Sequence, residues 1–103
     1  MINLVNVTGF QWDSGNARKS FEKHDVTQAE AEQVFFNQPL LIAEDTEHSK
    51  QEPRFHALGR TDDDRRLHIT FTLRKSGSLM RVISARDMHR KERATYEQIQ
   101  ENT

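Results

Sequence analysis

The sequence of 103 residues contains no cysteine. This absence excludes disulfide bonds, cysteine-ligated zinc or iron–sulfur sites, and a thiol nucleophile. No apolar run approaches about 18 residues, so no transmembrane helix is expected. The N-terminal residues MINLVNVTGFQWD contain neither a basic segment nor a long apolar stretch, so no signal peptide is expected. These absences favour a cytoplasmic protein, and the length predicts a single domain over residues 1–103.

Glycine and proline are also scarce, with four and two residues respectively. The sequence has no glycine-rich phosphate-binding loop, so no nucleotide cofactor is expected. Hydrophobic periodicity and capping residues indicate an α+β fold. The expected elements, in chain order, are a strand over 5–12, helices over 15–24 and 28–36, strands over 40–43, 54–58, 67–73 and 79–85, and a helix over 87–100.

The first two helices carry local boundary signals. Asp13 or Ser14 is expected to cap the start of the first helix, and Asp25 to end it. Thr27 and Glu30 have the spacing of a capping box, which predicts the start of the second helix.

Two of the expected strands, over 67–73 and 79–85, form a hairpin around a four-residue loop. That loop predicts three cross-strand partners: Arg74 with Leu79, Thr72 with Arg81, and Thr70 with Ile83. One face of the sheet is then apolar. The opposite face collects cationic and polar groups, namely Arg54, His56, Thr72, Arg74 and Arg81. A solvated outer face is the alternative interpretation, because antiparallel sheets commonly have one.

Charge is unevenly distributed along the chain, although the formal net charge is −1. Residues 1–53 hold 4 cationic and 9 acidic side chains, residues 54–93 hold 11 and 5, and residues 94–103 hold two glutamates. Nine of the cations in 54–93 are arginines, which suit bidentate contacts to phosphate. A surface that binds a polyanion and a surface that merely keeps the chain in solution both fit this distribution.

Two short segments contain groups suited to proton transfer. Lys23 and His24 are either cations stabilising a helix C-terminus or a histidine base beside a fixed positive charge. The segment His48–Arg54 contains a histidine, Glu52 and an arginine. These groups suffice for metal-free RNA cleavage, which needs a base, an acid and a cation for the phosphorane. No histidine or acidic pair has metal-ligand spacing, so no metal or other cofactor is expected.

A set of residues spread over about 9–98 resembles a known family. In chain order they are Phe10, Trp12–Asp13, Ala17, Phe21, Lys23–His24, Ala29, Val34–Phe35, His48–Ser49, Glu52, Arg54, Gly59, Thr72, Arg74, Arg81–Arg86, Glu92–Arg93 and Tyr96–Glu97. In order and spacing the sequence resembles the BrnT toxins of bacterial type II toxin–antitoxin systems. The resemblance implies a single toxin-like domain with a RelE-like fold: two N-terminal helices, an antiparallel sheet of about four strands and a C-terminal helix.

The resemblance also implies a ribonuclease that arrests translation. It implies a hetero-oligomer with a cognate BrnA-like antitoxin, a ribbon-helix-helix protein that binds DNA. The catalytic residues implied are His24, Lys23, Glu52, Arg54, Arg81 and Arg86. Within this set, His24 is the general base or acid and Glu52 is the other candidate. The RNA-binding residues expected beside them are Arg74, Thr72 and His56. The alternatives are a non-catalytic RNA- or protein-binding module that acts as an antitoxin co-repressor, and a relative that has lost activity.

Overall fold

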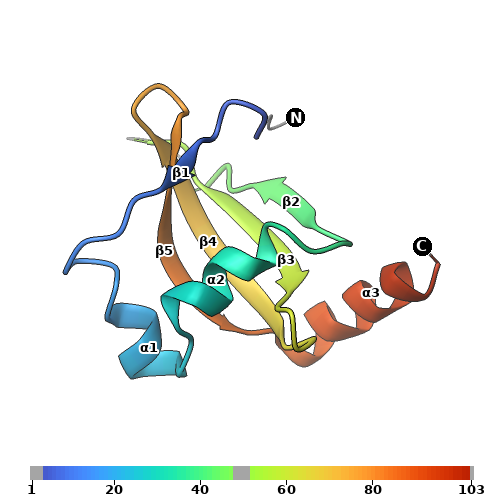
Figure 1. Ribbon diagram of the computed structural model, residues 1–103. Helices are drawn as coiled ribbons and strands as arrows, with labels where there is room; N and C mark the ends of the chain where they lie inside the picture. The colour runs from blue at the N-terminus through green and yellow to red at the C-terminus, as the bar shows by residue number, and fades with distance from the viewer. Residues whose placement is uncertain (1–3, 48–51, 103) are drawn as a thin grey trace.

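The computed structural model describes residues 4–47 and 52–102 (Figure 1). It has an α+β fold. Its elements are β1 (Gly9–Phe10), α1 (Lys19–His24), α2 (Gln28–Val34), β2 (Leu41–Glu44), β3 (Phe55–Arg60), β4 (Arg66–Arg74), β5 (Leu79–Asp87) and α3 (Arg90–Glu101). Over these two ranges, no helix is both long and apolar enough to cross a membrane.

The strands of the described ranges form one five-stranded sheet in the order β1-β5-β4-β3-β2. Strands β2 to β5 are antiparallel, whereas β1 runs parallel to β5. The expected antiparallel sheet of about four strands is therefore corrected to a mixed sheet of five. The strand expected over 5–12 is reduced to Gly9–Phe10, because Asn16 takes over the edge of β5 by donating from Nδ2 to the Val82 carbonyl at 3.0 Å.

The hydrophobic core lies between one face of the sheet and the first two helices. Leu67, Ile69 and Phe71 alternate along β4 and are completely buried. Helix α2 crosses this face in Figure 1 and contributes the buried side chains of Ala31 and Val34. The predicted apolar face of the hairpin is confirmed by these positions.

Two of the three predicted partners in the hairpin are confirmed, including Thr72 with Arg81. The third is wrong, because Thr70 pairs with Ser84 rather than with Ile83. The register shifts at this point, so β5 contains one extra residue. A bulge reverses the alternation of side chains, and the rest of β5 therefore keeps its polar residues on the same face as Arg81.

The helix boundaries are partly as expected. The predicted cap at Asp13 or Ser14 is wrong, because the Asp13 carbonyl closes a turn by accepting the Ala17 N–H at 2.8 Å, and α1 begins only at Lys19. Asp25 ends α1 in the left-handed conformation with φ 56°. The capping box at the start of α2 is present.

Helix α3 closes one end of the sheet. Tyr96 is completely buried, and its hydroxyl donates to the Pro39 carbonyl at 2.7 Å. The ion pair between Arg66 and Glu97, at 2.6 Å, attaches the same helix to β4.

Candidate functional site

The sheet face opposite α2 carries polar side chains in rows set by cross-strand pairing. We call this surface the polar sheet face. Its rows, starting from the α3 end, are Leu58, His68 and Arg86; then His56, Thr70 and Ser84; then Thr72 and Arg81, with Arg54 in the segment directly before β3. Neighbouring strands lie about 4.8 Å apart and successive rows about 7 Å apart. Two arginines and two histidines from three strands are thus collected on one surface.

Most of the predicted site residues lie on or beside the polar sheet face. His56, Arg81 and Arg86 occupy central strands, and Arg54 directly precedes β3. Glu52 lies at the border of the face, where a carboxylate oxygen is 3.1 Å from Nε of Arg74. The predicted loop residues His48 and Ser49 lie outside the described residues.

Thr72 is a correction within the predicted RNA-binding set. Its side chain is completely buried, and its hydroxyl donates to the Pro53 carbonyl. Pro53 belongs to the segment that enters β3, so this hydrogen bond covers Thr72 with the backbone of a neighbouring segment. The prediction that Thr72 lies on an open surface is therefore wrong.

Lys23 and His24 lie elsewhere, at the C-terminal end of α1. The His24 carbonyl accepts a hydrogen bond from Arg65 at 3.2 Å, and Arg65 binds Asp87 at the end of β5. Glu52, in contrast, lies near Leu79 at the start of β5, because Arg74 pairs with that residue. The eight residue-to-residue steps from Leu79 to Asp87 span about 26 Å. The structure therefore does not bring His24 and Glu52 into one site.

Arg81 and Arg86 of the polar sheet face have carboxylate partners. Arg81 binds both oxygens of Asp13, at 2.8 and 3.1 Å, and this ion pair lowers the pKa of the exposed Asp13 carboxyl. Arg86 binds both oxygens of Glu92, at 2.9 and 3.2 Å. Burial alone raises the pKa of Glu92, but the hydrogen bonds from Arg86 and from the His89 N–H lower it to about 2. Both carboxyls are therefore ionised at neutral pH.

Two histidines of this face contact each other, and sequence reasoning included only His56 in the site. The Nε2 atom of His56 lies 2.9 Å from a carboxylate oxygen of Asp45, and its Nδ1 atom lies 3.1 Å from the Thr70 hydroxyl. The ring of His68 lies 4.9 Å from that of His56, with 37° between the planes. His68 was visible in the period-two pattern of β4, but only the register of β3 against β4 shows that it lies beside His56.

His68 is held in its neutral form. Burial and the positive charge of Arg86 lower its pKa from 6.5 to about 4, although Glu92 opposes the effect of Arg86. Its Nδ1 is buried and has no hydrogen-bond partner among the residues described. In the same part of the chain, no group of three or more histidine, cysteine or acidic side chains is placed to hold a metal ion.

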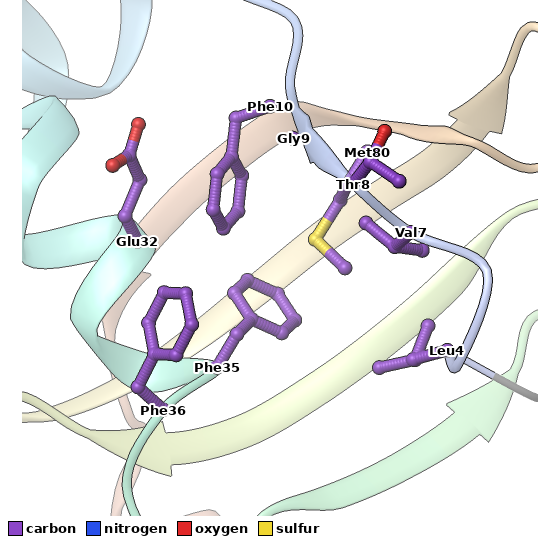
Figure 2. Close-up of a pocket in the computed structure, with 9 residues that line it drawn as sticks. All are labelled: Leu4, Val7, Thr8, Gly9, Phe10, Glu32, Phe35, Phe36 and Met80. Atoms are coloured by element: carbon purple, nitrogen blue, oxygen red, sulfur yellow. The ribbon is translucent and has the colours of Figure 1, made fainter.

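The helix side of the sheet contains a different feature, an apolar pocket of about 440 Å³ (Figure 2). The N-terminal segment, β1 and α2 line it, and the rings of Phe10, Phe35 and Phe36 face one another across it. Its titratable group among the described lining residues is Glu32, which accepts a hydrogen bond from Trp12 Nε1 at 2.7 Å. The polar sheet face, with its arginines and histidines, is thus the better candidate for chemistry.

Comparison with protein families identifies the class. Residues 12–92 match the family described as "Ribonuclease toxin, BrnT, of type II toxin-antitoxin system". This family consists of ribonuclease toxins of type II toxin–antitoxin systems, which implies a protein antitoxin as partner. The chain belongs to the BrnT family. No curated protein matches the sequence.

Proposed function

We propose that this BrnT protein cleaves RNA on its polar sheet face without a metal ion, and that this cleavage arrests translation. The observation that supports the site is the placement of Arg81 and Arg86 on one face of β5, with Arg54 directly before β3, along a surface that a single strand of RNA can follow. Guanidinium groups bind phosphate in bidentate geometry and stabilise the charge that develops on it.

The proposed reaction is an attack of the ribose 2′-hydroxyl on the adjacent phosphorus. Glu52 takes the proton of that hydroxyl, the 2′ oxygen bonds to phosphorus, and the bond to the 5′ oxygen breaks. The leaving 5′ oxygen takes a proton from water. The products are a 2′,3′-cyclic phosphate and a free 5′-hydroxyl, so atoms and charges balance. Arg81 and Arg54 stabilise the phosphorane, and Arg86, Arg74 and His56 bind the neighbouring RNA.

The remaining expectations are proposals of the same kind. We propose that residues 1–103 form one toxin-like domain of RelE-like layout, which acts in the cytoplasm. Its antitoxin is a BrnA-like ribbon-helix-helix protein that binds DNA and forms a hetero-oligomer with the toxin. The catalytic roles of Lys23 and His24 stay a prediction, and in this geometry they require RNA that extends around the edge of β5.

Expression in a bacterial host tests the function. Wild type should stop growth and fragment RNA, and purified protein should cleave RNA in EDTA. Arg81→Ala should lower cleavage about 100-fold, because loss of one group that stabilises the transition-state charge typically has that effect. Arg18→Ala is the matched control, since Arg18 is exposed and makes no side-chain cap bond at α1. Undiminished cleavage by Arg81→Ala contradicts the proposed face, and cleavage that EDTA abolishes contradicts metal independence.

One observation favours a second candidate, a binding module without catalysis that acts as an antitoxin co-repressor. Arg74, Arg81 and Arg86 are all neutralised by carboxylates of the same chain. Product formation distinguishes the two functions. A non-catalytic module binds RNA or antitoxin with a strong salt dependence, yet leaves RNA intact at equal expression of soluble protein.

A further inference from the structure

We infer that a cavity at the α3 end of the polar sheet face is a binding subsite for one unstacked nucleobase of RNA. The inference rests on the proposed function, since it assigns part of the RNA to a particular pocket. It concerns recognition of the base, whereas Arg54, Arg81 and Glu52 concern the phosphate and the ribose.

The cavity has a volume of about 320 Å³ and is lined by Leu41, Ala43, Leu58, His56, His68 and Glu92 among others. This volume is at the lower end of the range for small-ligand pockets. Aliphatic side chains from β2 and β3 form its walls, and the two imidazoles and one carboxylate supply polar groups. Such a combination suits a flat heterocycle with a polar edge.

The imidazoles provide a fixed aromatic surface. His56 is held through both ring nitrogens, by Asp45 at 2.9 Å and by Thr70 at 3.1 Å. His68 packs against it, with 4.9 Å between the ring centroids. Proteins that bind single-stranded RNA commonly stack its bases on aromatic side chains, including histidine.

The protonation states fit a base better than a phosphate. With a pKa of about 4, lowered by burial and by Arg86, His68 is neutral at physiological pH. A neutral ring stacks on a base but has no charge with which to attract phosphate. Its buried Nδ1 lacks a partner within the described part of the chain. Glu92 is ionised, and its oxygens accept three hydrogen bonds, which leaves room for a base N–H because a carboxylate offers about four acceptor positions.

The position of the cavity matches the phosphate-binding arginines. His68 and Arg86 are direct cross-strand partners, and such partners have Cα atoms about 5 Å apart. A nucleotide whose phosphate contacts Arg86 therefore has its base within reach of His68. The subsite and the phosphate contacts then bind adjacent parts of one nucleotide.

The experiment uses 2′-O-methyl RNA trinucleotides, which bind but lack the attacking hydroxyl. Four such probes differ only in the central base, and the imidazole proton signals of His56 and His68 report binding by NMR. We expect saturable shifts of both rings and at least a threefold spread of Kd among the bases.

Variants separate stacking from other effects. His68→Ala should weaken the best probe about tenfold, the scale of one lost base–aromatic stack, whereas His68→Phe should retain most of the affinity. Ala43→Leu should also weaken binding, because Ala43 is an exposed residue at the mouth of the cavity and a larger side chain fills it. Ala94→Leu is the matched control, since it makes the same change at an exposed position of α3 that does not line the cavity.

The outcomes distinguish this inference from the proposed function. Probes that bind without shifting either imidazole, or equal affinities in wild type, His68→Ala and Ala43→Leu, overturn the subsite. Cleavage of unmodified RNA by wild type would then still support the ribonuclease. Conversely, base-dependent shifts without cleavage of unmodified RNA support the subsite and contradict the catalytic role.

Discussion

His68 shows at the residue scale how burial decides what a titratable side chain does. In the unfolded chain it takes up a proton near pH 6.5, but in the folded protein only near its lowered pKa of about 4. Between these values the unfolded state binds more protons, so stability falls as the pH is lowered from 6.5 towards 4. The groups that face the ring are Arg86, Glu92 and His56. Replacing the His68 ring removes its contribution to the pH dependence of stability.

We expect the unfolding free energies of wild type and His68→Phe to respond differently to pH. Between pH 6.5 and about pH 5, wild type should lose about 1–2 kcal/mol more than the variant. Urea titrations at the two pH values measure this. The carboxyls with lowered pKa, such as Glu92, titrate below this window and do not mask the effect. Parallel losses in both proteins contradict a neutral, buried His68.

The candidate site was predictable residue by residue only where one strand determined the face. Alternation along β3 placed His56 correctly, because period-two burial needs no knowledge of the partner strand. Arg86 needed more, since it reaches the polar sheet face only through the register shift in β5. The contact of His68 with His56 depends on pairing between strands, and the burial of Thr72 depends on where Pro53 lies. Neither the contact nor the burial leaves a local pattern in the sequence.

At the element scale, helix α2 approaches β3 so closely that one position excludes a side chain. A Cβ atom on Gly59 would lie 2.5 Å from Cγ1 of Val34 and 3.3 Å from the Val34 carbonyl oxygen. Val34 is completely buried, so its side chain has little room to move. The glycine therefore sets the distance between the helix and the sheet.

Gly59→Ala should lower the unfolding free energy by about 1–3 kcal/mol, the usual effect of overpacking a core. Urea denaturation measures it. Gly9→Ala is the matched control, because a Cβ there meets Leu79 Cδ2 at an ordinary 3.6 Å. Equal stability of the two variants contradicts the close packing of α2 on β3.

The elements themselves were predictable where their signals are local. Thr27 and Glu30 lie within one turn, so the capping box gave the start of α2 correctly. The start of α1 was predicted too early, because Asp13 forms a turn and an ion pair with Arg81 rather than a cap. That partner lies 68 residues away in the sequence, and a local rule has no access to it.

At the scale of the whole molecule, Arg65 joins elements that the sequence separates widely. It binds Asp87 at 2.8 Å and Glu30 at 3.1 Å, and donates to the carbonyls of His24 and Asp25. The Asp87 and Glu30 carboxylates raise the pKa of Arg65 further above its ordinary value. This one side chain connects the ends of α1 and β5 with the start of α2, and it places His24 away from the polar sheet face.

The uneven distribution of charge is also a property of the whole molecule, and it predicts that RNA binding depends on salt concentration. Residues 54–93 hold 11 of the 15 cationic side chains, yet Arg74, Arg81 and Arg86 are paired with carboxylates. Exposed ion pairs contribute only about 0–1 kcal/mol, so an RNA phosphate displaces the exposed Asp13 carboxylate from Arg81 at small cost. Each displaced pair converts an internal contact into one that releases counterions from the RNA.

Three phosphates bound by Arg54, Arg81 and Arg86 predict a slope of about −2 for log Kobs against log salt, since single strands contribute about −0.7 per contact. Arg81→Ala should make the slope shallower by about 0.7, whereas Arg18→Ala should leave it unchanged. Fluorescence anisotropy with uncleavable 2′-O-methyl RNA at several salt concentrations measures these slopes. A slope near zero, or equal slopes for both variants, contradicts phosphate binding by the polar sheet face, because contacts of neutral groups release no counterions.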